Sequence, residues 1–441
     1  MRDTRNLLIA LIMLLGLCII AAAAGKDARP ARAGAPIPGL TKAQLAFFNA
    51  GKRNFSEIDS VTGSVPGTGE GLGPRFNSNS CASCHSYPAL GGTSPRQNPL
   101  YGVYRDQGAT NSMPWFVQDD GPVRVARFAY RSDGVTRDGG VHNLFVISGR
   151  QDAPGCNLAQ PDFEAAAAAN NLALRIPSPA FGDGLIEAIP DSAILANLRS
   201  QRPQKRALGI FGHPNRNGND GTISRFGWKA QNKSILMMVA EAYNVEVGVT
   251  NELFPTERDQ TPACQFNGTP EDETNFDLQG TQLPSDIERL QYFVRFLGPP
   301  RPAAITPDTV NGSIQFYETG CALCHTPSLA TGNSSVAALS QVEVNLYSDL
   351  LVHHMGPGLA DNIVQGSAGP DEFRTAPLWG VGHRLFFLHD GRSKDLLDAI
   401  EQHYSLGNGQ YPDSEANQVI RRFNALSEKN REDILRFLRS L

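Results

Sequence analysis

Apolar residues recur at the spacing of an amphipathic helix in several stretches of the chain. The C-terminal stretch is the clearest, because Ile434, Leu435, Leu438 and Leu441 repeat every three to four positions. The helices predicted in the chain span residues 42–55, 284–297, 309–318 and 428–441, with a short one at 164–171. The segments RVARFAY at 124–130 and HNLFVIS at 142–148 have the alternation and composition of strands. The chain is therefore predicted to be mainly α, with irregular loops and some β structure.

Three stretches of sequence occur twice, in the same order. PSPAFGDGLIEAIP at 177–190 resembles APLWGVGHRLFFLHD at 376–390, RFGWKAQNKSIL at 225–236 resembles FLHDGRSKDLL at 387–397, and RFLGPP at 295–300 resembles RFLRSL at 436–441. Prolines at 299, 300 and 302 mark a linker between the two copies. We expect two related domains, at 40–300 and 305–441, the first enlarged by β-containing insertions mainly within 93–175 and 191–222.

Composition excludes one broad class of function. The 441 residues include 39 Lys+Arg and 44 Asp+Glu, which gives a net charge of −5. A nucleic-acid-binding protein normally carries a basic excess, so we expect no nucleic-acid partner. The chain is 41% hydrophobic and 19% charged, which is sufficient for a packed core.

The N-terminus has the features of a signal peptide at 1–24. Arg2 and Arg5 precede an uncharged apolar run over 7–24, which ends in a small-residue cleavage site. The run is also long enough to span a bilayer, so an uncleaved N-terminal membrane tether is the alternative. Nothing later resembles a membrane helix, so we expect a periplasmic protein with no membrane span after signal cleavage.

The cysteines carry the strongest chemical signal in the sequence. The motif C-x-x-C-H occurs twice, as Cys81, Cys84 and His85 and as Cys321, Cys324 and His325. Two thiols three positions apart can each add to a vinyl group of haem, and the adjacent histidine then supplies an imidazole to the iron. A four-cysteine zinc site would not require a histidine after each pair. A thioredoxin-like redox pair would need a βαβ pattern nearby. The two motifs therefore predict two covalently bound haem c groups.

Two further cysteines, Cys156 and Cys264, remain in the mature chain. An oxidising compartment and an even number of cysteines favour a disulfide between them. Two separate buried thiols are the alternative.

The placement of helices around the haem motifs is that of cytochrome c. A helix precedes each motif, and another helix closes each predicted domain, at 284–297 and at 428–441. We therefore expect two cytochrome c-like domains, the first carrying the large insertions.

Several motifs taken together resemble a known family. They are LGPRFNSNSCASCHSYPALGG, LFVISGR, FGDGLIEAIP, RFGWKAQ, FRTAPLWGVG and FFLHDGR. As a set they are similar to the di-haem oxidoreductases, whose members are described as peroxidases or as thiol oxidoreductase-like. That family in turn resembles the bacterial di-haem cytochrome c peroxidases and the di-haem enzyme that matures tryptophan tryptophylquinone.

The resemblance implies roles for three residues. In the peroxidases, one stretch of the second domain ends in a methionine, which is the distal ligand of the electron-accepting haem. In this chain the matching stretch is LLDAIEQH, and His403 stands at the position of that methionine. Two imidazoles in place of His/Met would lower the potential of that haem. RFGWKAQ implies that Trp228 lies between the haems, although the Asp-Gly-Arg that follows this Trp in the peroxidases is missing, and a core tryptophan is the alternative. NVEVGVT implies that Glu246 lies over the open face of the first haem.

A peroxidatic site needs an acid/base group near the iron. Glu246 is the first candidate and a surface glutamate is its alternative. Glu187, the lone acid of the apolar run GLIEAIP, is the second candidate, with a hydrogen-bonded structural carboxylate as its alternative. His389 is expected to contact haem, and Met355 is the rival to His403 as axial ligand.

These observations lead to a prediction of function and one alternative. The prediction is an exported di-haem c-type oxidoreductase of peroxidase type, with a reactive N-terminal haem and an electron-transfer C-terminal haem. Its expected partner is a small periplasmic electron-transfer protein. The alternative is a non-catalytic di-haem electron-transfer cytochrome in which both irons have six ligands.

Overall fold

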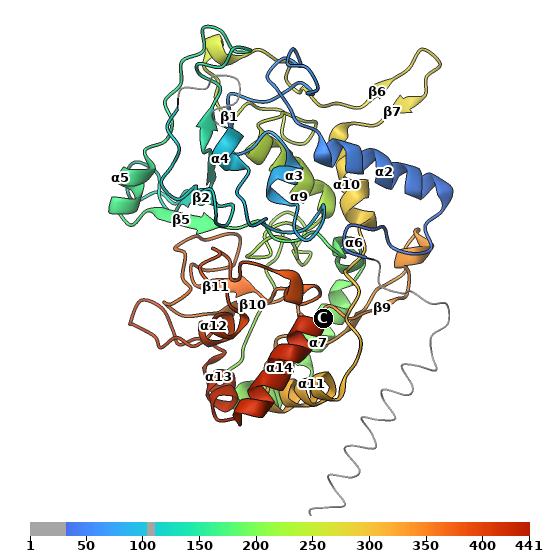
Figure 1. Ribbon diagram of the computed structural model, residues 1–441, viewed down its shortest axis with the longest axis vertical. Helices are drawn as coiled ribbons and strands as arrows, with labels where there is room; N and C mark the ends of the chain where they lie inside the picture. Colours follow the sequence, from blue (N-terminus) through green and yellow to red (C-terminus); the bar gives the residue numbers. More distant parts are fainter. Residues whose placement is uncertain (1–31, 104–110) are drawn as a thin grey trace, which may run out of the picture.

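The computed structural model describes residues 32–103 and 111–441, so the predicted signal peptide at 1–24 lies outside the described residues. The chain forms two lobes, seen as the upper and lower halves of Figure 1. The helices before the linker are α2 (Lys42–Ser56), α3 (Cys81–Cys84), α4 (Leu100–Val103), α5 (Phe163–Ala168), α6 (Asp183–Glu187), α7 (Asp191–Arg199), α8 (Arg202–Ala207), α9 (Ile235–Ala242) and α10 (Asp286–Phe296). The helices after it are α11 (Pro307–Thr319), α12 (Leu396–Glu401), α13 (Asn417–Asn424) and α14 (Glu428–Ser440). Every helix predicted from the sequence is present, with small shifts at the ends.

The same helix pair is built in both lobes. α2 packs against α10 in the upper lobe, and α11 packs against α14 in the lower lobe. A Cβ atom added to Gly51 of α2 would lie 1.9 Å from the carbonyl oxygen of Arg289, and one added to Gly312 of α11 would lie 1.9 Å from that of Asp433. In each pair a glycine therefore allows the two backbones to approach closely.

A second pair of glycines shows that the sequence repeat is also a structural repeat. Gly184 of FGDG and Gly382 of WGVG each lie against the last helix of their lobe. A Cβ added to Gly184 would lie 1.9 Å from the carbonyl oxygen of Arg295, and one added to Gly382 would lie 2.3 Å from that of Arg439. These contacts join the repeated FGDG/WGVG turns to the repeated RFLGPP/RFLRSL ends.

Strands occur in the insertion, as predicted. β2 (Val125–Phe128) pairs with both β3 (Val141–His142) and β5 (Leu172–Arg175), and β1 (Arg75–Phe76) pairs with β4 (Phe145–Val146). The prediction was wrong in confining strands to the insertions. Three more antiparallel pairs lie outside the predicted insertions. They are β6 (Asn275–Phe276) with β7 (Gln282–Leu283), β8 (Leu329–Ala330) with β9 (Glu343–Val344), and β10 (Val352–His354) with β11 (Glu372–Arg374). Strands of two or three residues are too short to show alternation in the sequence.

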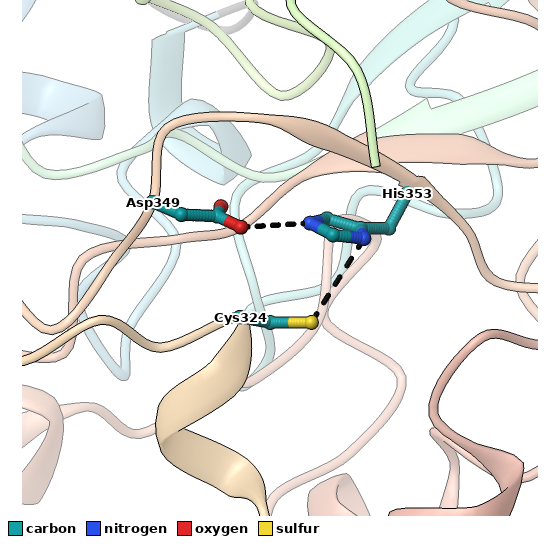
Figure 2. Close-up of side chains that lie close together, drawn as sticks. All are labelled: Cys324, Asp349 and His353. Carbon is teal, nitrogen blue, oxygen red and sulfur yellow. Dashed lines mark hydrogen bonds and ion pairs between the residues drawn. The ribbon is translucent and has the colours of Figure 1, made fainter. Parts of the chain in front are cut away.

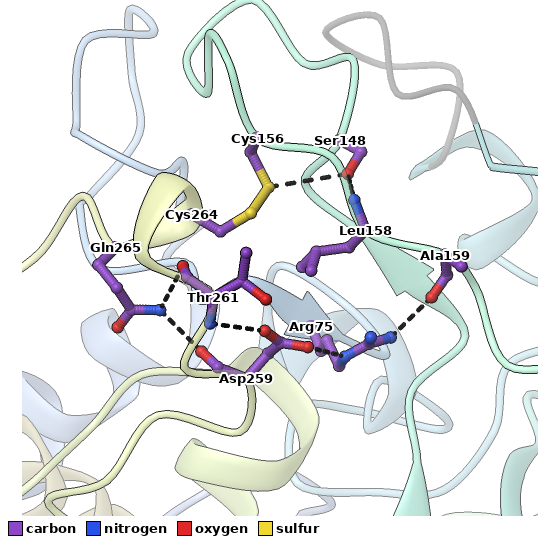
Figure 3. The surroundings of a disulfide bond; sticks show 9 residues. All are labelled: Arg75, Ser148, Cys156, Leu158, Ala159, Asp259, Thr261, Cys264 and Gln265. Atoms are coloured by element: carbon purple, nitrogen blue, oxygen red, sulfur yellow. Dashed lines mark hydrogen bonds and ion pairs between the residues drawn. A yellow bond between two sulfur atoms is a disulfide. The ribbon is translucent and has the colours of Figure 1, made fainter.

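The predicted disulfide is present and joins the insertion to the rest of the upper lobe. Cys156 and Cys264 are 108 residues apart in sequence, with their sulfur atoms at 2.11 Å (Figure 3). Beside it, Arg75 Nε donates to Asp259 at 2.8 Å and Arg75 Nη1 donates to the carbonyl oxygen of Ala159 at 2.9 Å. The disulfide thus joins the insertion to the segment that follows α9, and Arg75 of β1 bridges the same two segments by bonding to Ala159 and Asp259.

The larger apolar core lies in the upper lobe but also takes in residues from after the linker, including Leu339, Val344, Leu350 and Trp379, whereas a smaller core lies within the lower lobe. The upper core includes Phe48 of α2 and Phe293 of α10, whose rings are 5.2 Å apart, and the lower core includes Phe316 of α11 and Phe437 of α14, at 5.4 Å. Within the described residues, we find no helix with the length and apolar character needed to cross a membrane.

Candidate functional site

The first haem motif begins on α3 and ends at His85. Cys81 and Cys84 are not disulfide-bonded, and burial raises the pKa of the Cys81 thiol to about 12. His85 Nδ1 lies 2.9 Å from the carbonyl oxygen of Gly92. A carbonyl oxygen can only accept, so Nδ1 carries the hydrogen, and burial lowers the pKa of His85. The neutral ring then presents the lone pair of Nε2, as an iron ligand requires.

The second motif repeats this geometry. Cys321 and Cys324 are likewise unbonded, and His325 Nδ1 lies 3.0 Å from the carbonyl oxygen of Tyr347. Burial, with the nearby His403 as the next cause, lowers the pKa of His325 to about 4. Both motifs therefore hold a neutral histidine with Nε2 available to a metal.

A cavity of about 220 Å³ with mainly apolar walls adjoins the second motif. His325 and His403 both line it. His403 follows α12, and its Nδ1 donates to the carbonyl oxygen of Ala399 at 2.7 Å, so its Nε2 is also available. Burial lowers the pKa of His403, which favours the neutral, ligating form.

The other residues proposed for this haem line the same cavity. Met355 is buried against Leu359 and Phe373, so both the predicted axial ligand and its rival face the site. His389 is buried and stacks on Phe373 with ring centroids 4.3 Å apart. Burial lowers the pKa of His389 to about 4.

Two arginines that the sequence analysis missed also line the cavity. Arg374 Nη1 and Arg384 Nε are buried and make no hydrogen bond to the described residues. Burial lowers the pKa of Arg384 to about 10, with Arg374 as the next cause. Arg374 Nε donates to the carbonyl oxygen of Gly227 at 3.0 Å, but the other N–H groups named lack acceptors, and a buried cation is costly unless an anion lies close to it. Haem carries two propionates, so thiols, histidines, apolar walls and arginines together fit a haem c.

His353 of β10 forms a charged cluster beside Cys324 (Figure 2). Its Nε2 lies 3.0 Å from Asp349 Oδ2, its Nδ1 lies 2.7 Å from Glu415 Oε2, and its Nδ1 also lies 3.8 Å from Cys324 Sγ. Burial opposes a charge here, but the Asp349 carboxylate helps to hold the pKa of His353 well above its usual value. Because each ring nitrogen faces a carboxylate, we interpret His353 as a fixed imidazolium.

Glu246 lies beside the first motif on η2 (Tyr243–Val247), a π-helical turn that continues α9. Its Oε2 accepts from Asn77 Nδ2 at 2.7 Å, and its carbonyl oxygen accepts from the backbone N–H of Asn77, also at 2.7 Å. Burial raises the pKa of Glu246, and the Asn77 bond opposes that shift. Its charge in turn contributes to the raised pKa of Cys81 and of Cys84. The structure thus brings Glu246 to the first motif.

The two lobes differ at the position of His403. α9 begins at Ile235 and α12 begins at Leu396, and each follows a capping side chain, Ser234 or Asp395. Ala242 and His403 both lie seven residues after the first residue of their helix (242 − 235 = 403 − 396). The first lobe therefore has a methyl group at the position where the second lobe has an imidazole.

Trp228 lies at the boundary between the lobes. Its Nε1 donates to the carbonyl oxygen of Ile176 at 2.8 Å, and its ring lines the cavity of the second motif. The Trp228 and His389 rings are 6.5 Å apart, and the Arg384 guanidinium lies 5.9 Å from the indole centroid.

A short bonded route connects the first motif to this tryptophan. His85 donates to Gly92, and the next residue, Thr93, donates from Oγ1 to the carbonyl oxygen of Pro177 at 2.6 Å. Pro177 follows the residue that accepts the indole hydrogen bond. Trp228 is thus linked to the first motif while it contacts the cavity of the second.

Glu187 has structural partners for both carboxylate oxygens. Oε1 accepts from the backbone N–H of Ile235 at 2.8 Å, at the start of α9. Oε2 accepts from Arg295 Nη2 on α10 at 2.6 Å. These contacts favour the structural alternative for Glu187.

The family whose description reads "Di-haem oxidoreductase, putative peroxidase" matches residues 150–441. The match contains the second haem motif, Trp228, Glu246 and His403, and begins after the first motif. No curated protein matches the chain.

Solved structures also give matches, at low identity. Hydrazine synthase of Kuenenia stuttgartiensis is 14% identical over 95% of this chain and 96% of that chain, with a TM-score of 0.35. The diheme peroxidase BthA of Burkholderia thailandensis is 13% identical over 92% and 86%, with a TM-score of 0.33. A MauG-like protein associated with microbial copper homeostasis is 14% identical over 59% and 89%, with a TM-score of 0.30. These TM-scores are all below 0.5, so membership rests on the family match, which covers well over half of the chain. The chain belongs to the di-haem oxidoreductase family.

Proposed function

We propose that this protein is an exported di-haem c-type oxidoreductase of peroxidase type. In this proposal two cytochrome c-like domains, at 40–300 and 305–441, each hold one covalent haem. The first haem reacts with peroxide, and the second receives electrons from a small electron-transfer protein in the periplasm.

The observation that carries the proposal is the unequal surroundings of two otherwise matching histidines. His325 faces a cavity that a second imidazole, His403, also lines. By its offset from the start of α9, Ala242 of the first lobe corresponds to His403, and the polar group beside Cys81 of the first motif is the carboxyl of Glu246. Two imidazoles suit a closed electron-transfer iron, whereas a single imidazole with a nearby acid suits a reactive one.

Haem, when bound, supplies an iron that can accept peroxide at an open position and pass electrons between two centres. The chain supplies the remaining functions. Cys81, Cys84 and His85 hold the first group, and Cys321, Cys324 and His325 hold the second. Arg374 and Arg384 would pair with propionates of the second group, since their unpartnered N–H groups lie at its cavity.

Glu246 is proposed to move the proton. A general acid/base works best when its pKa lies near the working pH, and burial shifts the pKa of Glu246 upward in that direction. The Asn77 bond fixes Oε2 and leaves Oε1 to exchange a proton. Trp228 is proposed to carry electrons between the two sites, because it contacts the second cavity and is bonded towards the first motif.

Substitution of Glu246 tests the function. Glu246→Gln keeps the shape and an acceptor for Asn77 but removes the ionisable group. We expect the reaction with peroxide to slow by about 10²–10⁴-fold, the usual cost of losing a positioned acid/base. Stopped-flow spectroscopy on protein with both haems bound measures this rate.

Glu187→Gln is the matched control, because Glu187 is committed to Ile235 and Arg295. It should react at close to the wild-type rate. A wild-type rate in Glu246→Gln with a loss in Glu187→Gln would move the proton-transfer role to Glu187. Wild-type rates in both variants would instead favour the electron-transfer cytochrome.

A further inference from the structure

One segment of the chain has an unusual charge composition. Residues 192–219 contain no Asp or Glu, although the whole chain has a net charge of −5. The same segment contains five basic side chains, namely Arg199, Arg202, Lys205, Arg206 and Arg216. It lies within the second insertion expected in the first domain, 191–222, whose two acids, Asp191 and Asp220, directly flank the segment.

Most of these cations face solvent. Arg199 at the end of α7 and Arg202 and Arg206 on α8 are exposed. Lys205 is buried, and its Nζ donates to the carbonyl oxygen of Asn197 at 3.0 Å, which fixes α8 against the end of α7. The exposed arginines therefore project from an anchored pair of helices.

The segment that follows α8 lies against the second haem motif. Leu208 and Ile210 are buried with Leu323 and Val419, and this cluster contacts Cys321 and Cys324. Ile210 also lines the cavity that His325 and His403 share. An insertion of the first domain thus forms part of the wall around the second haem site, and α7 lies in the lower half of Figure 1 accordingly.

The residue after Ile210 is an exposed aromatic. The Phe211 side chain is 65% exposed, while its backbone N–H donates to the buried Glu415 Oε2 at 2.8 Å. The ring is therefore presented to solvent by a fixed backbone, one residue from the wall of the second cavity. α13 contributes Val419 to the same cluster and carries the exposed Arg421 and Arg422.

We propose that the insertion face, defined as Arg199, Arg202, Arg206, Phe211, Arg421 and Arg422, docks a small acidic electron-transfer protein. This rests on the proposed role of the second haem in electron transfer. One electron passes from the reduced metal centre of the partner to the second haem, so the partner is oxidised by one electron as that haem is reduced by one. The charge of the insertion face selects an acidic surface, and Phe211 supplies an apolar contact next to the electron's entry point.

The insertion face predicts opposite responses to two probes. The first is a reduced plastocyanin-type copper protein with an acidic surface, and the second is a reduced basic cytochrome c of similar size. Stopped-flow mixing with the haem-loaded protein gives the second-order rate of electron transfer for each. We expect the acidic probe to react faster and its rate to fall as salt is added, because opposite charges steer the encounter.

Charge reversal gives the decisive comparison. Arg202→Glu with Arg206→Glu should lower the rate with the acidic probe by about 10-fold or more at low ionic strength and raise the rate with the basic probe. Arg53→Glu with Arg131→Glu, two exposed sites of the upper lobe, is the matched control and should change either rate by less than about 2-fold. Phe211→Ser should weaken binding of the acidic probe, measured by NMR titration, while the salt dependence is retained.

The outcomes separate this proposal from the proposed function. Reduction by dithionite and the peroxide reaction with a small-molecule donor should be unchanged in all three variants. If peroxide does not react but the charge dependence holds, the peroxidase function fails and the docking face stands. An unchanged rate of the acidic probe after charge reversal would overturn the docking face. The docking face would also be overturned if the wild-type protein bound anionic lipid vesicles, the Arg202→Glu/Arg206→Glu variant did not, and the two reacted with the acidic probe at the same rate.

Discussion

The two haem motifs are alike on one side and different on the other. Each motif follows a helix that packs against the last helix of its lobe through a glycine, Gly51 or Gly312. Each holds its histidine by a hydrogen bond from Nδ1 to a backbone carbonyl oxygen. The repeated fold therefore presents Nε2 in the same way twice.

The difference lies in the side chains beyond the histidine. The first motif has carboxyl groups near it, including Glu246 and Asp59, whose charges both raise the pKa of Cys81. The second has the imidazole of His403, the arginines Arg374 and Arg384, and the His353 imidazolium. The comparison shows that the same scaffold carries different side chains around its two haem motifs, which is the basis of the two roles proposed above.

The largest effect is expected from removing one pair of thiols. Cys321→Ala with Cys324→Ala should leave one haem in place of two, and Cys81→Ala with Cys84→Ala should do the same for the other site, because each pair supplies both thioether bonds. Mass spectrometry after denaturation measures the retained haem. Cys156→Ser with Cys264→Ser is the control and should keep both. If the denatured wild-type protein had the mass of the polypeptide without haem, covalent attachment would be refuted.

Removal of the second imidazole should make the two sites more alike. His403→Ala should convert the second haem from low spin to high spin and leave the first unchanged, because the strong ligand on that side is lost. Absorption and electron paramagnetic resonance spectra report this change. Met355→Ala is the matched control from the same cavity. If only the methionine variant changes spin, the axial ligand is Met355 and the assignment of His403 is wrong.

A smaller effect, on stability, should distinguish the acidic surroundings of the first site. Burial, with Glu57 and Asp286, raises the pKa of Asp59 to about 8. The unfolded chain releases this proton near pH ~4. The raised pKa of Asp59 therefore adds most to the free energy of unfolding below that pH, and this contribution is lost as the pH rises towards 8. Asp59→Asn should raise the unfolding temperature at pH 8 relative to wild type, by roughly 2 °C or more, and should change it less at pH 5.

Exposed Glu273→Gln serves as the control for that measurement, since it removes a carboxyl from the same lobe without a buried site. Its unfolding temperature should follow that of the wild type at both pH values. Equal shifts in the two variants would show that overall charge, and not burial of Asp59, sets the pH dependence.

Much of this architecture was predictable from the sequence. The helices at 42–55 and 428–441 could be located because their apolar spacing is regular, and the disulfide because the other cysteines belong to haem motifs. The repeat of 225–236 at 387–397 also allows Ala242 to be aligned with His403 from the sequence. These features depend on local pattern or on repetition, which a single sequence contains.

Other parts of the site depend on contacts between distant segments. Asn77 binds Glu246 across 169 residues, and nothing in RFNSNSC identifies that partner. Arg374 and Arg384 occur in an apolar stretch, which is a sequence signal, but the N–H groups of theirs that lack acceptors are visible only in three dimensions. The packing of the 191–222 insertion against the second motif was also hidden, because it crosses from one lobe to the other.

The central claim is that one haem site is open and the other is closed. The most direct test is the spectrum of the purified ferric protein with and without peroxide. We expect one high-spin and one low-spin haem, and we expect peroxide to change the high-spin signal first and leave the low-spin signal unchanged. Two low-spin haems that do not react with peroxide would contradict it and identify the protein as an electron carrier.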